Sequence, residues 1–191
     1  MADYFPLRKG DKYDYQYSSS EFDGVGAASV IIMDVKHKAK ETTVLAKLTV
    51  ILKGHQTSTE YSIKKTGKAI VSGDGIVHGG RIEFTLPVRN GSKWCEEPDR
   101  CEIVSLKEKA EVPAGKFSGC LKVSGELEDG EGIAERFYAP GVGLVMETYN
   151  TPSLQAQVSL VAVSMATPAE LKPKRKQELS KKTKATDKPR R

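Results

Sequence analysis

The sequence predicts an all-β protein in which a single antiparallel meander forms a curved sheet, a half-barrel or a sandwich. Apolar residues recur with a period of two much more often than with the helical period of 3.6, and the apolar runs are rich in β-branched side chains. Glycine, asparagine or aspartate closes each run, as a succession of hairpins requires. The 17 glycines and 9 prolines suit the many turns of such a meander.

Ten short segments carry this pattern and are expected to be strands. They are 28–36, 43–52, 58–65, 68–72, 81–88, 102–107, 119–127, 133–139, 142–149 and 155–164. No segment before residue 165 repeats apolar residues at helical spacing. Over 167–179, Thr167 and Pro168 suit the start of a helix, but Pro173 should end it after about one turn.

The charge of the chain divides it into two parts. Residues 172–191 hold ten Lys or Arg and two acidic residues, a net charge of +8, which leaves 20 basic and 23 acidic residues, or −3, in the rest of the 191-residue chain. The basic end has too few apolar residues to offset the entropy lost on ordering. We therefore predict one β-rich domain over residues 1–166 and a disordered basic tail over residues 167–191.

The basic tail supplies the candidate contacts for an anion. Clustered lysine and arginine can bind nucleic acid or an anionic membrane surface through counterion release, which is non-specific and sensitive to salt. The equally weighted alternative is a solvated tail that only keeps the protein soluble, and the acidic body does not suit a dedicated nucleic-acid-binding domain. The candidate contacts are Lys174, Arg175, Lys176, Lys181, Lys182 and Lys184.

No pattern in the chain indicates an active site, a cofactor site or a metal site. His37, His55 and His78 lack metal-ligand spacing to another histidine or to a cysteine, and are expected to lie in exposed loops. The glycine-rich segment 73–80 precedes a strand and lacks the GK[ST] of a phosphate-binding loop, which favours a hairpin. The acidic residues of 126–131 are expected at an exposed hairpin tip, where carboxylate pKa values have little reason to shift. The sequence therefore predicts a protein that is not an enzyme and carries no cofactor.

Two local features have a structural and a functional interpretation. Tyr13, Tyr15 and Tyr17 would share one face of a strand, where they could stack on bases or sugars or pack in the core, and the core is favoured. Cys95 and Cys101 flank a Pro-Asp turn that a disulfide could close in an oxidising compartment, whereas free thiols are favoured because the chain shows no export signal. The single tryptophan, next to Cys95, is expected to anchor the core or this turn.

The ends of the chain give the expected location. No run of 18 apolar residues is present, so no transmembrane segment is expected. The first residues contain no apolar signal-peptide core, which predicts a cytoplasmic protein for the chain as written. A mature chain from which a signal peptide has been removed would instead belong to the envelope or periplasm.

Three segments resemble motifs of uncharacterised bacterial envelope proteins and lipoproteins. They are YFPLRKGDKY (4–13), VPAGKFSGCLKV (112–123) and FYAPGVGLVMETY (137–149), in the same order as in that group. The resemblance implies an antiparallel β architecture similar to the half-barrels of lipoprotein carriers, and no enzymatic activity. The Pro and Gly residues of these segments suit tight turns, so the motifs look like fold determinants rather than a site. The chain departs from the group by lacking a signal peptide and a lipobox cysteine and by adding the basic tail.

The leading functional hypothesis is a non-catalytic binding or scaffolding module. A curved sheet could hold an apolar small molecule or a lipid on its concave face, provided that the face is not filled by side chains. The alternative is an interaction module that its basic tail tethers to nucleic acid or to an anionic surface.

Overall fold

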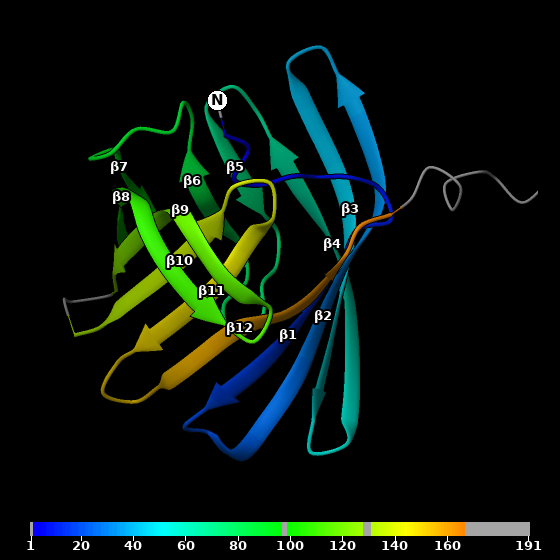
Figure 1. Cartoon of the computed structure of the whole chain (residues 1–191), viewed down its shortest axis with the longest axis vertical. Coiled ribbons are helices and arrows are strands. Elements are labelled where there is room, and N and C mark those ends of the chain that lie inside the picture. Colours follow the sequence, from blue (N-terminus) through cyan, green and yellow to red (C-terminus); the bar gives the residue numbers. More distant parts are fainter. Residues whose placement is uncertain (1, 97–98, 128–130, 167–191) are drawn as a thin grey trace, which may run out of the picture.

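The computed structural model describes residues 2–96, 99–127 and 131–166, and all of its regular structure is β-strand (Figure 1). The strands are β1 (Lys12–Ser19), β2 (Phe22–Lys38), β3 (Glu41–Leu52), β4 (His55–Lys65), β5 (Ala69–Ser72), β6 (Arg81–Thr85), β7 (Lys93–Glu96), β8 (Asp99–Val112), β9 (Gly115–Glu126), β10 (Ile133–Ala139), β11 (Gly143–Asn150) and β12 (Gln155–Ser164).

The twelve strands form one antiparallel sheet in the order β6-β5-β4-β3-β2-β1-β12-β11-β10-β9-β8-β7. β1 pairs with both β2 and β12, so the first and last strands lie side by side in the middle of the sheet. The sheet curls until its edge strands, β6 and β7, face each other across an open seam (Figure 1). This confirms the predicted antiparallel meander and curved sheet, and it rules out the sandwich because there is only one sheet.

Side chains bridge the seam where the backbone ladder is missing. The backbone N–H of Ile82 in β6 donates to the carboxylate of Glu96 in β7. The carbonyl oxygen of Ile82 accepts from Arg136 Nη1 at 3.2 Å. Both backbone groups of Ile82 that face the seam are therefore satisfied, as buried or edge backbone groups must be.

All ten expected strands are present, and two further strands were missed. β1 is the segment whose tyrosines alternate, and β7 is a four-residue strand, KWCE, in which apolar and polar residues do not alternate. The expected strand 81–88 ends at Thr85. The expected helical turn and the basic tail lie outside the described residues.

The concave face of the sheet is the core, and it is largely filled. Tyr13, Tyr15 and Tyr17 all point into it and are buried, which confirms the packing interpretation. The turn between β8 and β9 folds across this face, since the N–H of Ala114 donates to the carbonyl oxygen of Leu160 in β12 at 3.0 Å. The fold is therefore not an empty half-barrel, and any ligand site must be a remaining cavity.

Residues 2–11, here called the N-terminal strap, close the other end of the concave face. Asp3 pairs with Lys65 of β4 at 2.9 Å, and its carbonyl oxygen accepts from the N–H of Gly141 at 2.7 Å. Tyr4 donates its hydroxyl to the carbonyl oxygen of Gly119 in β9 at 3.2 Å. The strap thus ties together strands from both halves of the sheet (Figure 1).

The three motif segments meet at this strap. Tyr4 joins the first segment to the second at Gly119, and Asp3, the residue just before the first segment, contacts the third at Gly141. Gly141 and Gly143 have φ angles of 72° and 110°, which glycine adopts without strain. These contacts support the interpretation of the motifs as fold determinants.

Candidate functional site

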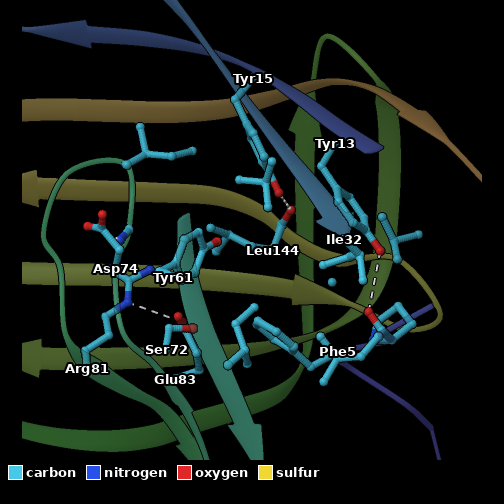
Figure 2. A pocket seen from close by; sticks show the side chains of 18 residues that line it. Phe5, Tyr13, Tyr15, Ile32, Tyr61, Ser72, Asp74, Arg81, Glu83 and Leu144 are labelled. Atoms are coloured by element: carbon cyan, nitrogen blue, oxygen red, sulfur yellow. Dashed lines mark hydrogen bonds and ion pairs between the residues drawn. The ribbon is translucent and has the colours of Figure 1, made fainter. Parts of the chain in front are cut away.

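A cavity of about 70 Å³ remains between the strap, strands β1, β2 and β4, and the loop Gly73–Gly80 (Figure 2). Its two ends differ in chemistry. Phe5, Tyr13 and Ile32 line one end, while Asp74 and Arg81 line the other, together with other polar side chains.

The apolar end of the cavity is built by period-two alternation in β1 and β2. Tyr15 and Ile32 are buried because inward positions of neighbouring strands converge there. The hydroxyl of Tyr15 donates to the carbonyl oxygen of Leu144 at 3.1 Å, so this buried polar group is satisfied. Burial, followed by neighbouring ionisable groups that include Glu83 and Glu147, raises the pKa of Tyr15 well above its ordinary value.

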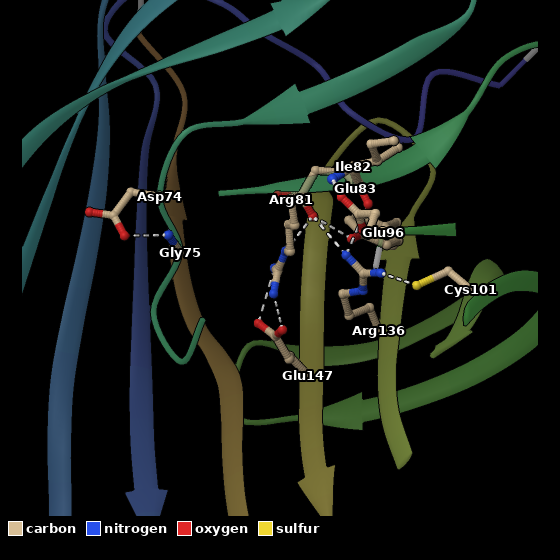
Figure 3. Close-up of polar contacts among 10 residues, drawn as sticks. Asp74, Gly75, Arg81, Ile82, Glu83, Glu96, Cys101, Arg136 and Glu147 are labelled. Carbon is tan, nitrogen blue, oxygen red and sulfur yellow. Dashed lines mark hydrogen bonds and ion pairs between the residues drawn. The ribbon is translucent and has the colours of Figure 1, made fainter. Parts of the chain in front are cut away.

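The polar end of the cavity begins at Arg81, an inward-facing residue of β6. Its Nη1 and Nη2 atoms bind both oxygens of Glu147 in β11, and Nη2 lies 3.2 Å from Oε2 (Figure 3). Its Nε donates to Glu83 Oε2 at 3.2 Å. Arg81 is 7% exposed and Glu147 is fully buried, so the two charges neutralise each other away from water.

A second arginine completes the cluster from β10. Arg136 Nη1 lies 3.7 Å from Glu83 Oε2, and Tyr138 donates its hydroxyl to the same oxygen at 2.6 Å. Arg136 Nη2 also donates to Cys101 Sγ at 3.6 Å. Burial by itself raises the pKa of Glu83, but Arg81, Arg136 and the Tyr138 hydroxyl hold the pKa below its ordinary value.

The four charged residues Arg81, Glu83, Arg136 and Glu147 are here called the buried ion cluster. Their charges sum to zero, and each one has at least one partner of opposite charge or a hydrogen bond within the cluster. Buried charges are stable only under such compensation. The cluster is therefore a structural element that also forms one wall of the cavity, through Arg81 and Glu83.

The loop Gly73–Gly80 forms the rim of the polar end and joins two antiparallel strands, β5 and β6, as the hairpin interpretation predicted. Asp74 Oδ1 accepts from the N–H of Gly75 at 2.8 Å. A Cβ atom at Gly75 would collide with the backbone oxygen of His78, so glycine is needed there for the loop to fold this tightly. The loop holds the half-buried carboxylate of Asp74 at the cavity.

The residues singled out from the sequence lie elsewhere. The six candidate anion contacts of the tail lie outside the described residues. Cys95 is exposed on one face of β7, whereas Cys101 is buried on the other face of the paired strand, so the two remain free thiols as predicted. Trp94 is half-buried and packs against the core, as expected of an anchor.

The expectation that the histidines lie in exposed loops is correct for His78 and partly wrong for the other two. All three are exposed, but His37 is in β2 and His55 begins β4. Both strands extend to the ends of long hairpins, where their side chains meet solvent on each face. Of the acidic residues of 126–131, Glu126 at the end of β9 and Glu131 are exposed as expected, whereas Glu128 and Asp129 lie outside the described residues.

Sequence reasoning missed the buried ion cluster. The only available signal was alternation: Arg81 and Glu83 share one face of their strand, and Glu147 shares a face with Val145. Period two shows which residues lie on the same face, but not which face is inward when both faces mix apolar and polar residues. The contact between Arg81 and Glu147, which lie 66 residues apart in the chain, decided which face is inward.

The fold and the cavity define a class: all-β proteins with one curled antiparallel sheet around a mostly filled interior. No protein-family model and no curated protein matches the sequence. The solved structures that are similar in fold include the following two. A protein of Bacteroides fragilis, described as a candidate exported protein with a YmcC-like fold, matches with a TM-score of 0.64 and 17% identity over 86% of this chain and 100% of its own. A candidate lipoprotein of Parabacteroides distasonis matches with a TM-score of 0.58 and 13% identity over 85% of this chain and 99% of its own.

The described residues contain no helix of the length and apolar character that a membrane crossing needs. Within the same residues, no three His, Cys, Asp or Glu side chains come together in a way that could hold a metal ion.

Proposed function

We propose that the protein is a non-catalytic binding module that holds a small apolar group, or the apolar part of a lipid, in the cavity beneath the N-terminal strap. One observation carries the proposal: the cavity combines an apolar end with a polar wall whose buried charges are already paired. Such a cavity offers shape and apolar contact to a ligand, with few polar groups to orient it.

The pairing within the polar wall argues against catalysis. Glu83 is the obvious candidate for a general base, but it already accepts from Arg81 and Tyr138. Its lowered pKa makes it a weak base, whereas a catalytic carboxylate needs a pKa near the working pH. Arg81 is likewise held by two carboxylates and is not free to stabilise a developing charge.

The size of the cavity limits the ligand. Pockets for drug-sized molecules are roughly 300–1,000 Å³, so a cavity of about 70 Å³ takes only a short alkyl group or one end of a longer molecule. A longer ligand requires movement of the strap. The ion pair between Asp3 and Lys65 that holds the strap is partly exposed, and such pairs contribute no more than about 1 kcal/mol.

We propose the bacterial envelope as the place of this activity. The fold is shared with proteins described as exported or as lipoproteins. The motif segments that resemble envelope proteins form the strap and the turns that it contacts. A protein that holds an apolar ligand in a cavity inside its sheet would be suited to the transfer or storage of a poorly soluble molecule in that compartment.

The test is native mass spectrometry of protein purified from its own host, with Val30→Phe as the blocking variant. Val30 is a half-buried residue that lines the cavity from β2, so a larger ring there fills the cavity. Val50→Phe is the matched control, because Val50 is half-buried, packs against the core from β3 and does not line the cavity. We expect a retained apolar molecule that disappears on denaturation and in Val30→Phe but not in Val50→Phe. A clean apo mass for the parent protein would contradict a tightly held ligand.

The second candidate function uses the tail. A net charge of +8 over residues 172–191, beside a body of −3, favours electrostatic attachment to nucleic acid or to an anionic surface. Deletion of residues 172–191 should then abolish salt-sensitive binding to anionic vesicles or to DNA and leave cavity binding unchanged.

A further inference from the structure

We infer that the ligand of the cavity carries a positively charged amine or ammonium group, seated at the polar end beside Asp74 and Tyr61. The inference rests on the proposed function and adds to it the chemical class of the polar group. Three observations support it: the charge balance of the interior, the aromatic wall and the occupied donors of Arg81.

The interior carries an excess of negative charge. Arg81 and Arg136 are balanced by Glu83 and Glu147, as described above. Asp74 adds a carboxylate that lines the cavity, and among the described residues it makes no ion pair; its oxygen accepts only from the N–H of Gly75. The cavity wall is therefore negative overall and attracts a cation. The attraction is stronger in a low-dielectric site than in water.

The aromatic wall has the same preference. Tyr13, Tyr15 and Tyr61 line the cavity together, and the faces of aromatic rings attract ammonium groups. Burial raises the pKa of Tyr61, and the next largest influence, Glu83, raises it further, although Arg81 opposes this.

An anionic ligand is the obvious alternative, because Arg81 lines the cavity. The guanidinium of Arg81, however, already donates from Nε, Nη1 and Nη2 to Glu83 and Glu147. A carboxylate or phosphate would have to displace one of these buried acids and also approach Asp74. The geometry therefore favours the cation.

The experiment compares three probes of equal chain length, n-butylamine, 1-butanol and butyrate, which are cationic, neutral and anionic at pH 7. Each is titrated into the full chain at constant ionic strength, and its dissociation constant is taken from chemical-shift changes of residues that line the cavity. We expect butylammonium to bind about tenfold more tightly than butanol and butyrate to bind most weakly, since about 1.4 kcal/mol corresponds to a factor of ten.

Asp74→Asn isolates the charge, because asparagine keeps an oxygen that can accept from the N–H of Gly75. This variant should reduce the affinity for butylammonium to that for butanol and leave butanol unchanged. Glu60→Gln, which removes an exposed carboxylate from β4, is the control and should change neither.

The outcomes separate this inference from the proposed function. Equal affinity for all three probes, lost in Val30→Phe, would overturn the cation preference and leave the apolar cavity in place. Tightest binding of butyrate would overturn it in favour of an anion. No binding of any probe, including butanol, would contradict the proposed function itself.

Discussion

The two halves of the interior are filled by different chemistry. Behind β1 to β4, the inward residues are tyrosines and aliphatic side chains such as Tyr15, Val44 and Ile63, all buried. Behind β6, β10 and β11, the inward positions also hold Arg81, Arg136 and Glu147, equally buried. The strap joins the halves, since Phe5 packs on Phe84 and Tyr138 of the charged half while Lys65 of the other half holds Asp3.

The two kinds of filling respond differently to substitution. Apolar burial is non-directional, so a buried aliphatic side chain can be replaced at the loss of its own contacts. A buried ion cluster is directional and collective, because removal of one member leaves its partner charged and uncompensated. The charged half should therefore be fragile to single changes and tolerant of paired ones.

The largest effect is expected from Glu147→Leu. The change leaves Arg81 buried with only Glu83 as a partner, and breaking a buried pair in this way costs about 3–5 kcal/mol. The double variant Arg81→Met, Glu147→Leu removes both charges and should be more stable than Glu147→Leu alone. Chemical denaturation measures each free energy of unfolding, and a double variant less stable than the single one would refute the collective behaviour of the cluster.

A smaller effect is expected from Val44→Ala in the apolar half. Val44 is fully buried in β3, and loss of its two methyl groups should lower the free energy of unfolding by about 2 kcal/mol. The change leaves no buried polar group without a partner, so the loss should reflect only the apolar contacts of Val44. A loss as large as that of Glu147→Leu would remove the contrast between the two halves.

The smallest effect at neutral pH is expected from Tyr15→Phe, which removes one hydrogen bond to Leu144 and should cost about 1 kcal/mol. Its main effect is on how the free energy of unfolding changes with pH above about pH 10. The folded-state pKa of Tyr15 is raised above its ordinary value of 10.0, so its contribution is fully present below pH 10 and is lost as the pH rises from there toward the raised pKa of the folded state.

Above pH 10, each buried tyrosine of this kind lowers the free energy of unfolding by about 1.4 kcal/mol for every pH unit. Thermal unfolding between pH 9 and 11.5 should therefore show a shallower decline in Tyr15→Phe than in the parent protein. At acidic pH the sign reverses for Glu83: its pKa is lowered, so stability is present above its ordinary value and is lost as the pH falls. An unchanged alkaline slope in Tyr15→Phe would show that Tyr15 ionises as freely in the fold as in the unfolded chain.

Most of the fold could be predicted from local pattern, and most of the site could not. The strands in the apolar half can be recognised from the sequence. In β3, for example, the buried residues Val44, Ala46 and Leu48 occupy every second position. β10 does not: its inward residues are Ala134, Arg136 and Tyr138, while Ile133 is 52% exposed. A pattern of this kind is ambiguous because the apolar residue lies outside and the arginine lies inside.

Local pattern was enough to predict the all-β class, the antiparallel hairpins and the shared face of Tyr13, Tyr15 and Tyr17, because period-two alternation and turn residues act over only a few positions along the chain. Local pattern could not show that the sheet curls until β6 faces β7, that the strap and the β8–β9 turn cover its concave face, or that Arg81 meets Glu147. These contacts join residues far apart in the chain, and a buried charge is acceptable only where the folded partners already stand beside it.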